Sequence, residues 1–172
     1  CDPVEDTVWA ATAMGLSRYN LRTGEWITYN HENAPFHEPW MYGVTMGNGN
    51  VYVGAWGAGV LELSKTTGVW REYRDPDKEF DLDLYADDGP VSDVTSSVDC
   101  GGGMLWQGSY VGLTRYDGRE WRSYYKEDSG LGGNFVNIVR SQGRFAWLAT
   151  DQGLSLTDGD GWATYRRLKD GR

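Results

Sequence analysis

The chain has 172 residues and a formal net charge of −9, and its aromatic content comes from 9 Trp and 11 Tyr far more than from 4 Phe. Its length is that of one ordinary domain that can bury a core. The negative charge disfavours a nucleic-acid partner, because phosphate backbones are bound by basic faces. No apolar run approaches the roughly 18 residues that would predict a membrane-spanning helix. With 24 Gly in the same chain, the composition favours an all-β protein.

In chain order, one pattern occurs four times. Each copy starts with an extended run that contains an aromatic residue, passes a glycine turn into Gly-Leu or Gly-Val, and ends at Trp-x-x-Tyr. The aromatic runs are "VWAAT", "VYVGA", "LWQGS" and "AWLAT"; the glycine pairs are Gly15-Leu16, Gly59-Val60, Gly112-Leu113 and Gly153-Leu154; the last motifs are Trp26/Tyr29, Trp70/Tyr73, Trp121/Tyr124 and Trp162/Tyr165. A valine-rich run precedes each of the last three copies ("YGVTM", "VSDVTSSV" and "FVNIV").

The spacing of the copies predicts the fold. The tryptophans of successive Trp-x-x-Tyr motifs lie 44, 51 and 41 residues apart. Four short strands in a period of about 40–45 residues are typical of β-propeller blades. We therefore predict an all-β fold of four blades, each a four-stranded antiparallel sheet, at residues 4–30, 40–75, 91–126 and 135–167 of one domain spanning 1–172. The repeated Trp and Tyr residues are expected to pack between blades.

The first copy differs from the others because it begins at its aromatic run, with no inner strand before it. About fifteen strands are therefore expected, where four complete blades need about sixteen. We expect the ring to be incomplete or open, with an edge strand that invites pairing.

The consensus "[VL]W-x-[GA]-[TS]-x-x-G-L-[ST]-R-Y-[DN]-G-x-x-W-x-x-Y" resembles the two-component regulator propeller repeat. That family occurs chiefly in periplasmic ligand-sensing domains of bacterial hybrid histidine kinases, and in some secreted or lipid-anchored proteins. The resemblance covers nearly the whole chain and is weakest in the second copy, where "GAGVLELSKTTGVW" stands. It implies a module outside the cytoplasm, in the periplasm or at the cell surface. It does not specify a function, because propellers host unrelated activities.

The first residue, Cys1, is a candidate for lipidation. Bacterial lipoproteins begin at a lipidated Cys once their signal peptide is removed, so Cys1 would attach the module to a membrane as a subunit of a larger assembly. The alternative is that Cys1 marks an excision point from a longer chain. Cys1 and Cys100 could pair, but 2 cysteines make neither a disulfide framework nor a metal site.

Candidate binding residues lie where the copies disagree. Propellers usually bind ligands on the face formed by the turns after the aromatic strands and the loops that enter the innermost strands. Trp56 and Tyr110 are aromatic residues on such turns, outside the packing pattern, and the loop "HENAPFHEPW" enters the second blade. The candidate residues for a neutral ligand, such as a sugar or a peptide, are Met14, His37, Trp40, Trp56, Tyr110 and Gln152. The alternative is that these side chains only pack one loop against another.

Neither catalysis nor a cofactor is predicted. The only two histidines, His31 and His37, lie on one irregular loop whose spacing does not enforce metal binding, and no nucleophile motif is present. The acidic insertion at 75–89 is a weak Ca²⁺ candidate, because its carboxylates cluster but fail the EF-hand template. Its candidate ligands are Asp75, Asp77, Glu79, Asp81 and Asp83. A solvated acidic loop is the alternative.

These observations predict a non-catalytic propeller module outside the cytoplasm that recognises a ligand or scaffolds a protein assembly. A protein partner or larger membrane complex is expected, a small neutral ligand is an option, and contact with a membrane would come only through Cys1. The alternatives are a sensor-domain fragment of a two-component signalling protein and a propeller lyase or hydrolase that uses His31 or His37.

Overall fold

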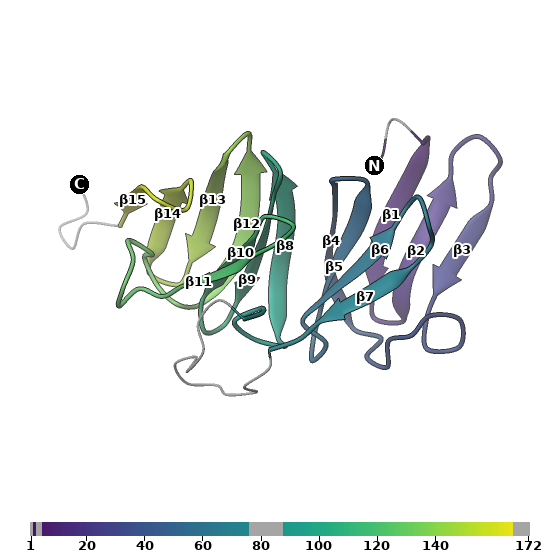
Figure 1. The fold of residues 1–172 in the computed structure, drawn as a ribbon, viewed down its shortest axis with the longest axis horizontal. Coiled ribbons are helices and arrows are strands. Elements are labelled where there is room, and N and C mark those ends of the chain that lie inside the picture. The colour runs from purple at the N-terminus through teal and green to yellow at the C-terminus, as the bar shows by residue number, and fades with distance from the viewer. Residues whose placement is uncertain (1, 3–4, 76–87, 167–172) are drawn as a thin grey trace.

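The computed structural model describes residues 2, 5–75 and 88–166, and all regular structure in these residues is β-strand. Its strands form four antiparallel sheets in which each strand pairs with the next one along the chain (Figure 1). We call these sheets blades 1 to 4. Blade 1 holds β1 (Thr7–Thr12), β2 (Gly15–Asn20) and β3 (Trp26–Tyr29), and blade 2 holds β4 (Met41–Gly47), β5 (Asn50–Ala55), β6 (Val60–Ser64) and β7 (Trp70–Tyr73). Blade 3 holds β8 (Thr95–Gly101), β9 (Met104–Ser109), β10 (Leu113–Tyr116) and β11 (Trp121–Tyr124), and blade 4 holds β12 (Val136–Gln142), β13 (Phe145–Thr150), β14 (Gly153–Thr157) and β15 (Trp162–Tyr165).

This arrangement confirms the predicted all-β fold of propeller blades with an open ring. The described residues form fifteen strands, and blade 1 has three of them where each of the other blades has four. Strands β4, β8 and β12 lie side by side as the innermost strands of blades 2, 3 and 4. Blades 1 and 4 lie at opposite ends of the array (Figure 1). Among the described residues there is no helix with the length and hydropathy needed to cross a membrane.

The turn before each Trp-x-x-Tyr strand is fixed by one polar side chain. Asn20 Oδ1 accepts hydrogen bonds from the backbone N–H groups of Arg22 and Thr23, at 2.9 and 3.0 Å. The equivalent carboxylates of blades 3 and 4, Asp117 and Asp158, bind the backbone N–H groups two and three residues further on. These N–H donors hold the pKa of both carboxyl groups below the usual range. Blades 1, 3 and 4 therefore have an Asx turn here, whereas in blade 2 the Ser64 hydroxyl accepts the N–H of Thr67 at 3.3 Å.

The blades pack through a repeated set of side chains. We call the face that a blade turns toward the next one its forward face. It carries the aromatic residue of the aromatic run, the residue after the repeat glycine and the Tyr of Trp-x-x-Tyr. In chain order these sets are Trp9, Leu16 and Tyr29; Tyr52, Val60 and Tyr73; Trp106, Leu113 and Tyr124; and Trp147, Leu154 and Tyr165. The first three sets belong to three apolar clusters that also contain residues of the following blade. Packing between blades thus explains most of the repeated aromatic residues.

The opposite face of each blade, its backward face, carries the Trp of Trp-x-x-Tyr. Trp70 and Trp162 are half-buried and Trp121 is 8% exposed, and all three contact the preceding blade. The expectation of packing is wrong for Trp26, which is 62% exposed because no described blade precedes it. Cys100 is a free cysteine beside the cluster between blades 2 and 3, and burial raises the pKa of its thiol to about 12. Cys1 lies outside the described residues, so a pairing of Cys100 with Cys1 stays a prediction.

Candidate functional site

The sheet register brings two kinds of connection to one end of the blades. The first residue of each innermost strand pairs with the last residue of the aromatic strand beside it, as Met41 does with Ala55, Thr95 with Ser109 and Val136 with Thr150. The loops that enter the innermost strands and the turns that follow the aromatic strands therefore share an end. We call this end of the array the rim.

The turns at the rim are held by hydroxyl groups. In blade 1, Thr12 Oγ1 donates to the carbonyl of Gly15 at 2.8 Å and accepts the N–H of Met14 at 3.1 Å. Ser109 and Thr150 make the equivalent bonds in blades 3 and 4. Blade 2 has Ala55 at this position, and Thr95 of blade 3 donates to the Gly59 carbonyl instead, at 2.8 Å. Each of these turns is therefore held by at least one hydrogen bond from a side-chain hydroxyl.

Four aromatic rings from three blades form a continuous row along the rim. The ring of Tyr42 lies 5.3 Å from that of Trp56, centroid to centroid, and Trp56 lies 5.3 Å from Tyr110 in an edge-on contact. Tyr110 in turn stacks on Phe135 at 4.2 Å and 8°. The aromatic row (Tyr42, Trp56, Tyr110 and Phe135) therefore links β4, the β5–β6 turn, the β9–β10 turn and the start of β12.

The row presents apolar surface to solvent. Tyr42 is 53% exposed and Tyr110 is 36% exposed, while Trp56 and Phe135 are half-buried. Trp40 adjoins the row: it is 51% exposed, and its carbonyl accepts the N–H of Trp56 at 2.9 Å. A small cavity of 240 Å³ opens beside it, lined by Ala13, Trp40, Met41 and Tyr42. Aromatic groups held in this way resemble the anchors of recognition surfaces.

The structure brings several predicted site residues together at the rim. Trp56 and Tyr110 are in direct contact, and Trp40 lies beside them. Met14 is 70% exposed on the β1–β2 turn, next to Ala13 of the small cavity. Gln152 is exposed on the β13–β14 turn, where the neighbouring Asp151 donates its N–H to the carbonyl of Phe135.

Two residues of the row, Tyr42 and Phe135, were not among the candidates from the sequence. Both stand at the start of a valine-rich run, in "YGVTM" and "FVNIV", and so read as ordinary strand residues. The available signal was their place in the repeat, since an aromatic residue that leads into an innermost strand lies at the same end as the turns.

The remaining candidates are not part of the aromatic row, and most of them lie outside the described residues. His37 and His31 are exposed on the loop between β3 and β4. In the described part of the chain no three His, Cys, Asp or Glu side chains are grouped as a metal site. Of the Ca²⁺ candidates Asp75 is described and buried, and its N–H binds Asp93 Oδ1 at 2.9 Å. Asp77, Glu79, Asp81, Asp83 and the lipidation candidate Cys1 lie outside the described residues.

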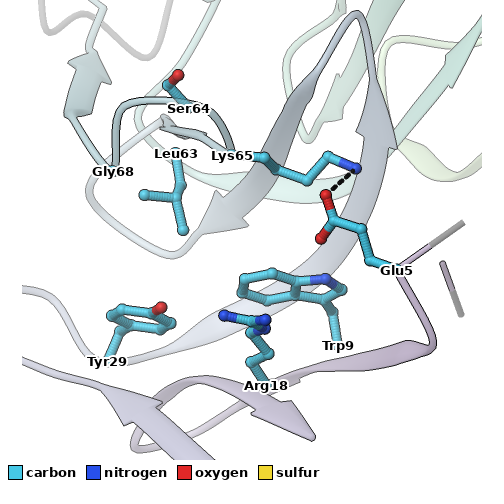
Figure 2. A pocket seen from close by; sticks show the side chains of 8 residues that line it. All are labelled: Glu5, Trp9, Arg18, Tyr29, Leu63, Ser64, Lys65 and Gly68. Carbon is cyan, nitrogen blue, oxygen red and sulfur yellow. Dashed lines mark ion pairs between the residues drawn. The ribbon is translucent and has the colours of Figure 1, made fainter. Parts of the chain in front are cut away.

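A second cavity, of 350 Å³, lies between blades 1 and 2 (Figure 2). Lys65 on its border forms ion pairs with Asp2 at 2.6 Å and Glu5 at 3.1 Å, and the Asp2 contact is the main cause of the raised pKa of Lys65. The Arg18 guanidinium lies 5.8 Å from the centre of the Trp9 ring. Charged side chains that are already paired occupy one side of this crevice, the cavity between blades 1 and 2, whereas the aromatic rings at the rim are open to solvent. The rim is therefore the better candidate for recognition.

Comparison with known proteins supports the fold alone. No protein-family model and no curated protein matches the sequence, so membership of the two-component regulator propeller repeat family remains a prediction. The extracellular domain of a hybrid two-component system from B. thetaiotaomicron matches with a TM-score of 0.67 at 15% identity, over 96% of this chain and 21% of that one. The WD40 repeats of RRP9 match with a TM-score of 0.66 at 11% identity, over 95% of this chain and 48% of that one. YCF48 bound to D1 peptide matches with a TM-score of 0.58 at 12% identity, over 93% of this chain and 50% of that one.

The chain thus has the β-propeller fold and spans about a fifth of the length of the two-component domain that it matches. Its blades resemble those of the two-component-system extracellular domain and of the RRP9 WD40 repeats.

Proposed function

We propose that this chain is a non-catalytic recognition module that binds an extended segment of a protein partner along its rim. The observation that carries the proposal is the aromatic row, in which rings from three blades touch one another and remain open to solvent. Aromatic side chains dominate the energy of protein interfaces because they bury large areas at low cost in conformational entropy.

The geometry of the row favours an extended peptide over a compact ligand. The row crosses blades 2, 3 and 4 in succession, and Trp40 extends it toward blade 1, where it lines a small cavity with Ala13. Because the rings already contact each other, little further ordering is needed when a partner binds. The similar propeller YCF48 was solved bound to a peptide, which supports this kind of partner by analogy of fold. The row supplies apolar contact and no reacting group, so we assign it no catalytic role.

We propose further that the module works outside the cytoplasm, as the similar domain of the two-component system does. A lipid on Cys1 would hold it on a membrane within a larger assembly. The intact mass of the protein from its native source tests this: an excess of several hundred daltons on Cys1 is expected, and an unmodified Cys1 would exclude lipidation. If the chain is instead part of a sensor, the same rim would receive the signal, and residues preceding Cys1 would then be found in that mass.

Substitution at the row tests the proposed function. Short peptides selected on the protein from a random phage-displayed library are expected to bind at least about tenfold more weakly to Trp56→Ala and Tyr110→Ala variants, because each change removes a central anchor. Isothermal titration calorimetry measures the affinities. Trp26→Ala is the matched control, because Trp26 is equally aromatic and 62% exposed but lies away from the rim. An equal loss of peptide affinity in all three variants, or no loss of affinity in the two rim variants, would contradict the proposal.

A further inference from the structure

One aromatic pair recurs at all three junctions between blades. The Tyr of Trp-x-x-Tyr in one blade contacts the Trp of Trp-x-x-Tyr in the next. The ring centroids are 5.5 Å apart for Tyr29 and Trp70, 5.1 Å for Tyr73 and Trp121, and 5.4 Å for Tyr124 and Trp162. The two members left over are Tyr165 at the end of blade 4, 58% exposed, and Trp26 at the start of blade 1, 62% exposed. The ends of the array thus carry the two halves of a fourth pair.

The forward face of blade 4 has the same pattern of repeat residues as the forward face of blade 3, which the next blade covers. Cross-strand pairing places Ile138, Ala149, Leu154 and Tyr165 in one row and Arg140, Trp147, Leu156 and Ala163 in the next. Trp147, Leu154 and Tyr165 correspond to Trp106, Leu113 and Tyr124 of blade 3, whose exposed fractions are 0%, 0% and 4%. In blade 4 Leu154 is 40% exposed and Ile138 is 49% exposed, since no described residue covers this face.

This uncovered face is more apolar than its buried counterpart. Where blade 3 has Ser97, Arg115 and Arg122, the register puts Ile138, Leu156 and Ala163 in blade 4. An exposed sheet face of this kind marks an interaction surface, because large contiguous apolar patches are rare on isolated domains. Its small residue Ala149 matches Ala11 of blade 1, which packs against blade 2.

The backward face of blade 1 carries the complementary features. Its hydroxyl pair, Ser17 Oγ and Thr28 Oγ1 at 3.1 Å, repeats the pair Ser155 and Thr164 of blade 4 at 2.9 Å. In blade 4, Ser155 Oγ accepts the N–H of Gly132 from the preceding connection at 2.9 Å. At the equivalent place in blade 3, Thr114 Oγ1 accepts the N–H of Val91 at 2.8 Å. Blade 1 therefore has a hydroxyl in the position that in blades 3 and 4 accepts an N–H from the preceding connection, whereas blade 2 has Leu61 there.

We propose that two copies of this chain associate head to tail, with the forward face of blade 4 in one copy packed on the backward face of blade 1 in the other. A heterologous contact of this kind closes into a ring when the rotation permits. Two copies together supply eight blades, which lies within the range of about 4–8 blades typical of a closed propeller ring. Each closed dimer contains two identical junctions, and both bury a Tyr165–Trp26 pair. This inference does not depend on what binds the rim.

Two single variants and their mixture test the proposal. By analytical ultracentrifugation, the unaltered chain is expected to have twice the monomer mass. Leu154→Arg destroys the forward face of blade 4 and Trp26→Arg the backward face of blade 1, so each variant alone is expected to be monomeric. When they are mixed, one intact face of each remains, and a one-to-one heterodimer is expected to form through a single junction. Trp40→Arg, a change at the rim, is the control and should leave the dimer intact.

Several outcomes would overturn the proposal. These are a monomeric unaltered chain at the highest soluble concentration, a dimer that survives both Leu154→Arg and Trp26→Arg, and a mixture that forms no heterodimer. Circular dichroism shows whether the variants fold. If either does not, Trp26→Ala and Tyr165→Ala replace them: each alone should be monomeric at a concentration at which the unaltered chain is dimeric, and their mixture should form the one-to-one heterodimer. A dimer that survives both alanine variants would equally overturn the head-to-tail arrangement.

Discussion

The Trp106→Ala variant is expected to lose about 4 kcal/mol in its free energy of unfolding, the largest effect of any substitution considered. Trp106 is fully buried and joins blade 3 to Val136, Val139 and Leu148 of blade 4. Truncation removes most of the apolar contact at this junction and leaves a cavity, because the sheets on either side cannot close around the missing ring. Since the total stability of a domain is about 5–15 kcal/mol, the variant should be close to unfolding at physiological temperature.

Urea denaturation followed by far-UV circular dichroism measures this loss. Trp40→Ala is the matched control, because the same atoms are removed from a side chain that is 51% exposed. It should change the free energy of unfolding by less than about 0.5 kcal/mol. Similar losses in both variants would show that junction packing is not the main source of stability.

The Gly59→Ala variant is expected to lose about 3 kcal/mol in its free energy of unfolding. Gly59 has φ +61°, in the left-handed region that favours glycine, and a Cβ atom there would lie 2.3 Å from the carbonyl oxygen of Tyr73. That carbonyl belongs to the adjoining strand, so it cannot move without breaking the sheet. The repeat glycines Gly15 and Gly153 meet the same obstacle, at 2.1 and 2.4 Å from the corresponding carbonyls.

Gly112 provides the control for this prediction within the same chain. It is the repeat glycine of blade 3, but its φ lies outside the left-handed region and its Cβ would be 3.1 Å from the Tyr124 carbonyl. Gly112→Ala should therefore lose about 1 kcal/mol or less. The comparison is made by urea denaturation of both variants. Equal losses at the two positions would contradict the steric explanation of the Gly-Leu and Gly-Val motif.

The sequence predicts the blades well because each copy repeats most of the same local chemistry, although Gly112 lacks the left-handed φ and blade 2 has Ser64 in place of Asn or Asp. A glycine that must avoid a neighbouring carbonyl, an Asn or Asp that binds the next N–H groups, and an alternating aromatic strand each specify local structure. In blade 2 the hydrogen bond that holds the rim turn comes from a different residue, because Thr95 of the next blade replaces the missing hydroxyl of Ala55. The hydrogen bond is therefore kept although the residue at this repeat position differs.

The site was only partly predictable from sequence. Trp56 and Tyr110 were found because they break the repeat, but Tyr42 and Phe135 look like the start of a strand until the register places them beside the turns. Exposure was the least predictable property. Trp26 and Trp121 occupy the same repeat position, yet one is 62% exposed and the other 8%, because exposure depends on whether a neighbouring blade is present.

Nuclear magnetic resonance of the indole N–H groups tests most directly whether the rim is the recognition surface. The chain has 9 Trp, and single Trp→Phe variants assign their signals. On titration with a selected peptide, the signals of Trp40 and Trp56 should shift, while that of the fully buried Trp106 stays in place. Shifts at Trp9 beside the crevice between blades 1 and 2, with none at Trp40 or Trp56, would contradict recognition at the rim.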